Sequence, residues 1–419
     1  MSFKYRIADR LVDGLGMILS AAGEGPYRYV LQAMSERSRW DPHPRIDADL
    51  HLYLPDPVLP DPDETPLVER IFEAFVSAKQ AQQGADPALL PAIGWQRVID
   101  NSYRSLTRAL ETGDLSGTHE FLSNFLSWKE PTGIEDSRLI HEYSNVEHQR
   151  RYFERRAMHP LLYWWHRTES RGRDFSTLAL PPIGNPCGVM VDGNIISRGS
   201  VFAEIHARTL AGLVTGDRPV VAELGGGFGR LAYFMSRNLD RFCYIGFDLP
   251  ETLVCSAYYL IQAFPEKKFL LYGEDELTPD SVADYDFILW PSTELGRLRD
   301  RSVDLFINEN SLGCMTSRSS NHYVRDICRI SNQFWHRNHE FRTNDYGAGE
   351  RSLANREYPV PLDDFDLVSR YLDIGPLIGE GHVDFDSDMM CYHYRRKPRT
   401  EAKRAEHEGG KAAALPAAR

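Results

Sequence analysis

The clearest pattern of apolar and polar positions runs from residue 220 to residue 250. Three apolar residues, Val220 to Ala222, are followed by Glu223 and a glycine cluster. An apolar run that ends in this way predicts a buried strand followed by a tight turn. The cluster consists of Gly225, Gly226, Gly227 and Gly229. Leu231 begins one face of a predicted helix, and residues 243–247 predict a second buried strand that ends at Asp248.

Strand-like and helix-like patterns continue to alternate after Asp248. Pro250 begins a predicted helix whose apolar residues recur at offsets of 4, 7, 8 and 11 from Leu253. A further helix is predicted at 323–330, and short strands at 268–272, 287–290, 303–307, 333–336 and 389–394. Alternating strands and helices predict an α/β fold with an open, largely parallel, Rossmann-like sheet. Ligands of such sheets bind at the carboxyl ends of the strands.

The first 180 residues carry mainly helical patterns. Helices are predicted at 7–22 and 27–35, and Thr65-Pro66 opens another, with the threonine as its cap and the proline in its first turn. Apolar residues between Trp95 and Leu110 mark one further helix, and those between Phe121 and Leu126 a third. Seven prolines and many aspartates in residues 41–66 predict an extended connector on the surface.

These patterns divide the chain into three parts. We expect a mainly helical region at 1–180, the sheet-bearing domain at 181–397, and a disordered tail at 398–419 that is poor in large apolar residues. The Asp192-Gly193 pair lies between two short apolar runs and predicts a hairpin within residues 184–200. Residues 202–214 then predict a helix that leads into the glycine stretch.

A segment from residue 137 to 167 is dense in aromatic, histidine and arginine side chains. They include Tyr143, His148, Tyr152, Tyr163, Trp164, Trp165 and His166. In a helix, such rings with polar neighbours suit the apolar face and the hydroxyls of a sugar, and they could form a wall of an acceptor site. The rings could equally pack the helix against the rest of the protein. The sequence leaves both interpretations open.

Composition limits the class of partner. A net charge of −12 provides no basic surface for a polyanion, so we expect no nucleic-acid partner. No apolar run approaches the length needed to span a bilayer, and the first residues lack the apolar core of a secretory signal, so we expect a cytoplasmic protein without a membrane partner. Six scattered cysteines without a C-x-x-C pair predict reduced thiols and no cysteine-based zinc site.

The spacing of the glycines bears on the ligand. A dinucleotide-binding turn has a third glycine where this chain has Arg230. The order found here is Glu223, Gly225, Gly227 and Gly229, with Asp248 at the end of the next strand. It resembles motif I and the acidic end of motif II in the class I S-adenosylmethionine (SAM) methyltransferases. A purely structural glycine turn is the alternative.

This resemblance implies a set of cofactor contacts. Gly225, Gly226 and Gly227 would pass under the methionine part of SAM, and Glu223 would lie near its amino group. Asp248 would accept hydrogen bonds from the ribose hydroxyls, since a carboxylate can accept from both hydroxyls of a diol. Leu249 and Asn308 are expected at the same site. For the adenine we expect Trp290 and Pro291, because an aromatic residue near a strand end can pack on the ring.

Three local features resemble a family of sugar O-methyltransferases from bacterial glycan and natural-product pathways. They are ELGGGFGRLA followed by FDLPETL and Tyr258-Tyr259, the preceding G-N-P-x-G hairpin, and INENSLGCMT at 307–316 with the aromatic-rich strand after it. Together they cover about residues 180 to 345. The family pattern has a Glu-Met pair where this chain has Cys314 and Met315. The resemblance implies a SAM-dependent O-methyltransferase whose product is S-adenosylhomocysteine (SAH) and whose acceptor is a sugar or small glycoside.

Methyl transfer to a hydroxyl requires an in-line arrangement and a base for the hydroxyl proton. The region after the fourth strand is expected to face the methyl group, which makes Glu309 and, further on, His322 candidate bases. His339, at the end of the next strand, is a third candidate. Each of these side chains could instead be structural. We expect no metal requirement, although Glu309 and His339 could converge on one.

Two alternatives to the sugar acceptor remain open. A phenolic or polyketide hydroxyl would suit the aromatic segment 143–166 as a flat stacking wall. A binding protein with a degenerate methyltransferase fold would keep the fold without turnover. The sequence does not determine whether the chain forms a homo-oligomer.

Overall fold

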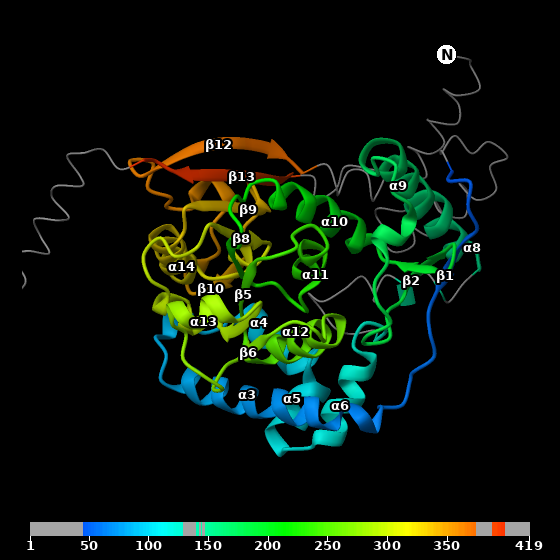
Figure 1. Ribbon diagram of the computed structural model, residues 1–419, viewed down its shortest axis with the longest axis horizontal. Helices are drawn as coiled ribbons and strands as arrows, with labels where there is room; N and C mark the ends of the chain where they lie inside the picture. The colour runs from blue at the N-terminus through cyan, green and yellow to red at the C-terminus, as the bar shows by residue number, and fades with distance from the viewer. Residues whose placement is uncertain (1–44, 129–139, 142–143, 145–146, 374–387, 399–419) are drawn as a thin grey trace, which may run out of the picture.

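The core of the protein is one large sheet. A computed structural model describes residues 45–128, 140–141, 144, 147–373 and 388–398. Within them, eight strands form the sheet in the order β12-β13-β9-β8-β4-β5-β7-β6 (Figure 1). These strands are β4 (Val220–Leu224), β5 (Cys243–Asp248), β6 (Phe269–Leu271), β7 (Phe287–Pro291), β8 (Leu305–Glu309), β9 (Gln333–His339), β12 (Phe365–Leu372) and β13 (Met389–Arg396).

The directions of the strands indicate at which edge of this sheet a ligand would bind. The neighbouring pairs from β6 to β9 are all parallel, and only β13 runs against the others. From β4 the chain passes to β5 on one side and later to β8 on the other, so the order of strands reverses at β4. Ligands of open α/β sheets bind beyond the carboxyl ends of the strands at such a reversal.

Helices cover both faces of the parallel part of the sheet, because β4, β5, β6 and β7 consist mainly of buried apolar residues. One apolar core joins a sheet face to the helices α10 (Arg198–Ala211), α11 (Arg230–Ser236) and α12 (Pro250–Ala263). A second core joins the opposite face to α14 (Ser317–Ile330), with α13 (Pro279–Asp284) at its margin. The expected α/β fold with a Rossmann-like, mainly parallel sheet is confirmed.

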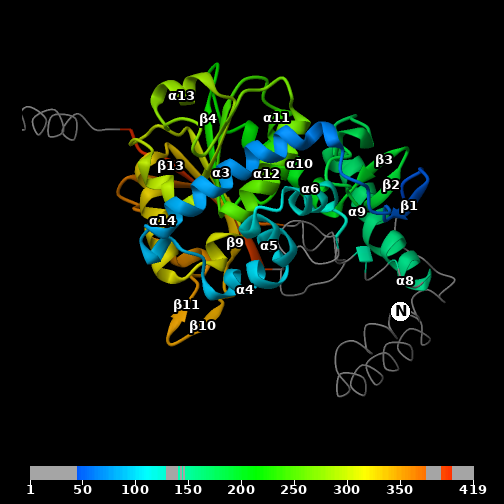
Figure 2. The ribbon, with the colours of Figure 1, turned by 90° about the horizontal axis from the view of Figure 1, so that it is seen from below.

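A layer of earlier helices lies on α12. It contains α3 (Thr65–Gln83), α4 (Ile93–Asn101), α5 (Arg104–Thr112) and α6 (Leu115–Asn124), and Figure 2 shows α3 lying across α12. Glu64, just before α3, accepts a 2.5 Å hydrogen bond from the Tyr258 hydroxyl of α12 and lies 3.1 Å from His119 of α6. Lys79 forms an ion pair with the buried Glu251. The layer shares its apolar core with the sheet domain across residue 180, so the division of the chain at that residue stays a prediction.

A second, three-stranded sheet corrects the expected connector. β1 (Leu50–Tyr53) lies within residues 41–66 and pairs with β2 (Gly188–Val191), which forms a hairpin with β3 (Asn194–Ile196). Leu50 and Leu52 are buried, so this part of the extended connector does not lie on the surface. β1 has no local sequence signal, because its partner lies about 140 residues later. The predicted hairpin turn is confirmed, with positive φ at Asp192 and Gly193.

The aromatic segment packs against this small sheet. Its described part is helical, through α8 (Glu147–Tyr152), a π-helical turn (Phe153–Met158), α9 (His159–Trp164) and a second π-helical turn (Trp165–Glu169). Trp165 is fully buried and donates a 3.0 Å hydrogen bond from its indole nitrogen to Glu204. Tyr163 and Trp164 pack on the same core. For these described rings, packing rather than an acceptor wall is the observed role.

Several expected boundaries differ from the structure. The helix predicted from Trp95 to Leu110 is broken at Tyr103 into α4 and α5. Thr65 is the first residue of α3 rather than its cap, because a 3-10 turn at Pro62–Glu64 precedes it and is capped by Asp61. β8 begins at Leu305. The sequence missed β12, whose residues are mostly exposed and lack a buried strand's apolar run.

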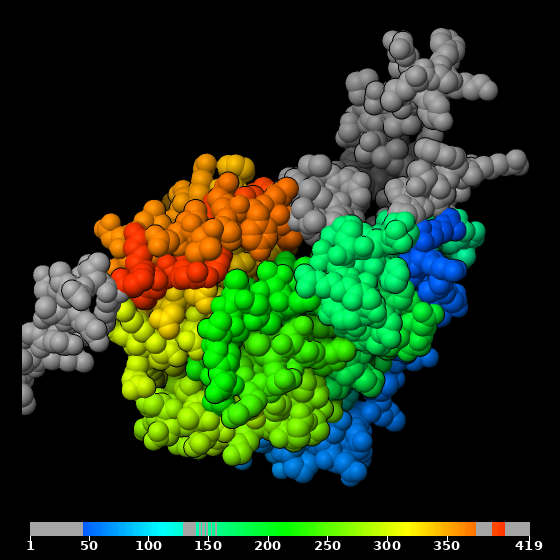
Figure 3. Space-filling view, turned by 45° about the horizontal axis from the view of Figure 1, so that its top comes forward, coloured from blue at the N-terminus to red at the C-terminus, as the bar shows by residue number. Residues whose placement is uncertain are grey.

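Other expectations lie outside the described residues. They are the helices at 7–22 and 27–35, and the tail from 399 onward. Among the described residues, no helix has the length and apolar character needed to cross a membrane. Figure 3 shows β12 and β13 at the surface, and the exposed fractions of Leu367 and Val368 on β12 are 46% and 47%.

The Glu64 contact generates a stability prediction. Substituting Tyr258→Phe removes the donor to Glu64 and leaves a partly buried carboxylate with one partner fewer. We expect the free energy of unfolding to fall by about 1–2 kcal/mol in urea denaturation at pH 7. The control is Tyr163→Phe, a half-buried tyrosine in a different core, which should stay within about 0.5 kcal/mol of the parent. Equal stability of the two variants would contradict a role for Glu64 in holding the helical layer.

Candidate functional site

The glycine turn after β4 brings backbone close to two other strand ends. Gly225 has a φ of 79°, and a Cβ at this position would lie 2.3 Å from the Cβ of Ser311, which follows β8. Only glycine fits such a left-handed and crowded position without strain. Gly227, with a φ of 61°, donates its backbone N–H to Asp248 at 2.9 Å. The turn is therefore held between the end of β5 and the loop after β8.

Asp248 ends β5 inside the site. One carboxylate oxygen accepts from the Gly227 N–H and the other from the Leu249 N–H at 2.7 Å. Burial raises the pKa of Asp248 to about 7, although these hydrogen bonds and one with Thr252 lower it. Thr252 also shares a hydrogen bond with the buried Tyr103, so the break between α4 and α5 brings a helical-layer residue next to this carboxylate.

Glu223 occupies the penultimate position of β4 and is 2% exposed. The Tyr244 hydroxyl donates to its Oε2 at 2.5 Å. Burial raises the pKa of Glu223 to about 8, although this hydrogen bond lowers it, and the charges of Glu309 and Asp248 raise it further. Three carboxylates therefore face one another across the strand ends.

The loop after β8 is tied to the glycine turn by side-chain hydrogen bonds. The Asn308 amide and the Ser311 hydroxyl both donate to the Leu224 carbonyl, at 2.9 and 2.8 Å. Asn338 of β9 donates to Asn308 at 3.0 Å. Asn310 adopts a left-handed backbone with a φ of 59°, a conformation that asparagine tolerates better than most residues. The chain thus turns sharply after Glu309 and fixes the direction of that side chain.

Glu309 forms a pair with His206 of α10, whose Nδ1 lies 2.7 Å from its Oε1. Burial lowers the pKa of His206, but the charges and hydrogen bonds of Glu309 and Asp373 outweigh it and raise that pKa to about 9. Burial raises the pKa of Glu309, yet His206 and then Arg337 outweigh it, so the pKa lies below its ordinary value. Arg337 in turn pairs with Asp373. The pair is an imidazolium beside a carboxylate near neutral pH.

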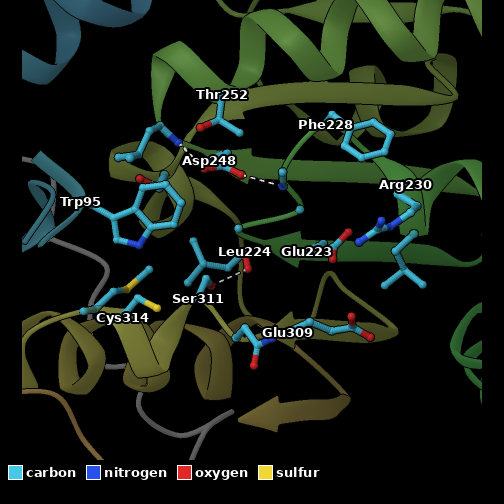
Figure 4. Close-up of a pocket in the computed structure, with 18 of the residues that line it drawn as sticks. Trp95, Glu223, Leu224, Phe228, Arg230, Asp248, Thr252, Glu309, Ser311 and Cys314 are labelled. Carbon is cyan, nitrogen blue, oxygen red and sulfur yellow. Dashed lines mark hydrogen bonds between the residues drawn. The ribbon is translucent and has the colours of Figure 1, made fainter. Parts of the chain in front are cut away.

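Most of these groups line one cavity of about 520 Å³, and Tyr244, Asn308, Asn338 and Asp373 are not part of its lining. Figure 4 shows Glu223 and Asp248 near its middle, with Trp95 and Cys314 at one end and Glu309 and Arg230 at the other. The apolar end is lined by Leu89, Leu90, Pro91, Ala92, Trp95, Leu249, Thr252, Ser292, Cys314, Met315, Ser319 and Tyr323. The charged end is lined by Arg198, Phe202, His206, Arg230, Glu309, Asn310 and Arg337.

The structure brings most of the expected cofactor residues to this cavity but fewer of the expected catalytic ones. Those that line it are Glu223, Gly225, Gly226, Gly227, Asp248, Leu249 and Glu309. Asn308 lies beneath the turn, where it is fully buried. Trp290 and Pro291 are buried in β7 and do not line the cavity, and Trp290 packs edge-to-face on Tyr272 at 5.0 Å.

The two other candidate bases lie outside the cavity lining. His322, on α14, is 3.4 Å from Asp326, and His339 is 2.6 Å from Asp388. Among the described residues, no three or more His, Cys, Asp or Glu side chains gather as metal ligands would. Across the same part of the chain, the six cysteines form no disulfide.

Sequence reasoning missed His206, Arg337 and the residues of the helical layer that line the apolar end. A signal for His206 existed. Gly199, Phe202, Ala203 and His206 recur at helical spacing on the cavity face of α10, and a titratable group on such an otherwise apolar face suggests a site. Arg337 gave no comparable signal, because its role depends on β9 lying beside β8.

Comparison with known proteins yields likenesses of fold over about half of the chain. No protein-family model matches it, and no curated protein matches its sequence. A glycopeptide N-methyltransferase, MtfA, complexed with sinefungin is 12% identical over 47% of this chain and 87% of its own, with a TM-score of 0.32. A TehB-like SAM-dependent methyltransferase from Corynebacterium glutamicum is 15% identical over 46% and 88%, with a TM-score of 0.30.

A third solved structure concerns the conversion of a disulfide bond into a thioacetal group during echinomycin biosynthesis. It is 12% identical over 51% of this chain and 88% of its own, with a TM-score of 0.33. Likenesses at such low identity and TM-score carry no information about the function of this chain. The proposal of a function therefore rests on the geometry of the site.

The pairing of His206 with Glu309 can be measured directly. In nuclear magnetic resonance titrations of ring-labelled histidine, the His206 signal, assigned by its loss in His206→Gln, should titrate with a pKa of about 9. In Glu309→Gln the imidazolium loses its nearest negative charge, so the pKa should fall toward or below the ordinary histidine value. Asp326→Asn, which removes the partner of His322, is the control and should leave His206 unchanged. A pKa near 6.5 in the parent protein would show that the pair does not form.

Proposed function

We propose that this protein is a SAM-dependent O-methyltransferase that methylates a sugar hydroxyl. One observation carries the proposal. Two carboxylates at adjacent strand ends, the buried Glu223 of β4 and the half-buried Asp248 of β5, face a single cavity beneath a glycine turn at the reversal point of the sheet. The cavity is in the size range of small-molecule sites, about 300–1,000 Å³.

The residues present fit SAM in hydrogen bonding. Asp248 already accepts two backbone N–H groups, but each carboxylate oxygen has a further lone pair, so both can also accept from the vicinal hydroxyls of a ribose. Gly226 passes close to Glu223, since a Cβ on it would lie 2.9 Å from Glu223 Oε2. The glycine turn thus leaves room for the methionine part beside Glu223.

The residues also fit SAM in charge. The pKa values of Glu223 and Asp248 are raised first by burial, and nearby carboxylates raise them further. A ligand that brings an ammonium group and a sulfonium to this place would stabilise the ionised carboxylates and so gain affinity. An anionic nucleotide such as a dinucleotide would have the opposite effect.

When bound, the cofactor would supply an activated methyl group, and the protein would supply position and a proton acceptor. Glu309 is the candidate base, because it is the cavity-lining carboxylate at the charged end. In this proposal the acceptor oxygen would give its lone pair to the methyl carbon, the bond from that carbon to sulfur would break, and SAH would leave with the electron pair on sulfur. The hydroxyl proton would pass to the Glu309 carboxylate. Its low pKa makes it a weak base. A weak base is sufficient, because the hydroxyl becomes strongly acidic as the new carbon–oxygen bond forms.

His206 and Arg337 would act as positioning residues. His206 donates to Oε1 of Glu309 and fixes the carboxylate, and it remains protonated near neutral pH. Arg337 contributes positive charge to Glu309 and forms an ion pair with Asp373. The two cations His206 and Arg337 balance the two carboxylates Glu309 and Asp373, so this group of four side chains would be close to neutral before the acceptor's proton arrives.

The charged end also favours a sugar as the acceptor. Its side chains include guanidinium and imidazolium donors, carboxylate and amide acceptors, and one aromatic ring, Phe202. A sugar presents several hydroxyls and an apolar ring face, which match such a set. A phenolic acceptor would need flat apolar walls, and the described rings of Tyr163, Trp164 and Trp165 pack on the small sheet instead.

Cofactor binding should release protons. At pH 7, Glu223 and Asp248 are partly protonated, and SAM would lower both pKa values, so calorimetric titration should show on the order of one proton released per SAM bound. The number of protons released is obtained by comparing the binding heats measured in two buffers that differ in ionisation enthalpy. Affinity should accordingly rise as pH increases from 6 to 7.5.

The substitution Asp248→Asn should weaken SAM binding by about 10- to 150-fold, the scale of hydrogen bonds to a charged group. The matched control is Asp304→Asn, because Asp304 also accepts a backbone N–H, from Val220, but at the opposite end of β4. Its affinity should be unchanged. The cofactor assignment fails if the parent protein gives no binding heat with SAM or SAH.

Turnover should depend on Glu309. With labelled SAM and a panel of glycosides and phenols, Glu309→Gln should lower kcat about 10²- to 10⁴-fold while leaving the affinity for SAM within a few fold. His322→Gln and His339→Gln serve as controls, since both side chains lie outside the cavity lining, and both should keep near-parental turnover. Methylation of phenols alone would replace the sugar assignment. Tight SAM binding without any product from the panel would favour a non-catalytic binding protein.

A further inference from the structure

Part of the helical layer crosses the apolar end of the cavity. This part, residues 89–95, begins at the last residue of the 3-10 turn Pro87–Leu89 and extends into the first turn of α4. We call it the strap. Five of its seven residues line the cavity: Leu89, Leu90, Pro91, Ala92 and Trp95. Figure 4 shows the Trp95 ring extending into the cavity near Asp248 and Ser311, on the side away from Glu309.

The strap is held in place by contacts with the sheet domain. The Tyr323 hydroxyl of α14 donates to the Leu89 carbonyl at 3.3 Å, and Arg318 lies 3.3 Å from Asp86. Gly94 lies against the ring of Tyr346, on the strand β10 (Asp345–Gly347), so closely that a Cβ would be 3.3 Å from it. These contacts fix the direction of the strap relative to the strand ends.

Trp95 and Cys314 both line the apolar end. Burial raises the pKa of Cys314 and the neighbouring Trp95 lowers it, so the two side chains lie close together. The indole of Trp95 is half-buried, because part of its surface faces the cavity.

The apolar end has the composition of a site for a flat base. Aliphatic side chains from Leu89, Pro91, Leu249 and Met315 surround it, and Ser292 and Thr252 add a few hydroxyls. Such a mixture suits a heteroaromatic ring, whose faces are apolar and whose edge forms hydrogen bonds. The end also adjoins Asp248, so a ribose bound there would direct its base toward the strap.

We infer that Trp95 forms one face of an adenine site, and that the helical layer thereby completes the cofactor pocket. The inference rests on the proposed function and extends it to a residue outside the Rossmann-like part of the chain. It replaces the expected adenine contact Trp290, which is 2% exposed and packs on Tyr272. Trp95 is a positioning residue for the base and takes no part in proton transfer.

The test compares binding of SAH and of 5′-methylthioadenosine, which keeps the adenosine part but lacks the amino acid. Trp95→Ala should weaken both ligands by the same factor, about 5- to 150-fold, the scale of a base stacked on an aromatic ring. Trp95→Phe should restore most of the affinity, because a phenyl ring keeps a stacking face for the base. SAH should also change the tryptophan fluorescence of the parent protein but much less that of Trp95→Phe.

The matched control is Trp164→Ala, which removes another half-buried indole, in the core of the small sheet, and should leave both affinities unchanged. If Trp95→Ala does not fold, Trp95→Leu takes its place, since leucine fills the space without a ring face and should bind less tightly than Trp95→Phe. Parental affinity in a folded Trp95→Ala, or equal affinity of the Leu and Phe variants, would overturn the inference. Absence of SAH binding by the parent protein would instead overturn the proposed function.

Discussion

The gathering of three carboxylates at one edge of the sheet, where Glu223 is buried and Asp248 and Glu309 are half-buried, is the constraint on which the site depends. Parallel pairing aligns the ends of β4, β5 and β8. The side chains of Glu223, Asp248 and Glu309 therefore lie close together. A buried charge without partners is costly, and each of the three is satisfied in a different way. Glu223 accepts a hydrogen bond from Tyr244, and Asp248 accepts hydrogen bonds from backbone N–H groups. Glu309 pairs with His206. These different partners give three chemically similar groups different proton affinities.

The sheet strands could be predicted because their signals are local. Val220–Leu224 and Cys243–Asp248 are apolar runs that end at an acid, and the glycines between them admit few other structures. β1 and β12 could not be predicted, because their pairing depends on partners elsewhere in the chain. The break at Tyr103 is also a long-range effect, since Tyr103 meets Thr252 of α12 where periodicity alone predicts a continuous helix.

Within the candidate site, too, residues with local sequence signals could be predicted and residues brought in by long-range contacts could not. Motif spacing predicted the cavity-lining positions of Glu223 and Asp248, which belong to one continuous stretch of sequence. His206 and Trp95 escaped prediction because they reach the cavity from α10 and from the helical layer. Trp290 looked suitable in the sequence because it ends an apolar run, but its ring is buried in the second core against Tyr272. The period of a strand fixes alternation, but it does not reveal which face meets the ligand.

The packing of α3 on α12 has a consequence for folding during synthesis of the chain. The apolar stripe of α3, with Val68, Ile71 and Phe75, emerges from the ribosome roughly 180 residues before α12 is complete. At ordinary translation speeds, that delay is about 10 to 40 seconds. During this interval the stripe has no native partner on α12. The stripe is therefore exposed to aggregation while the chain grows, and the helical layer reaches its final position only after β4, β5 and α12 have been synthesised.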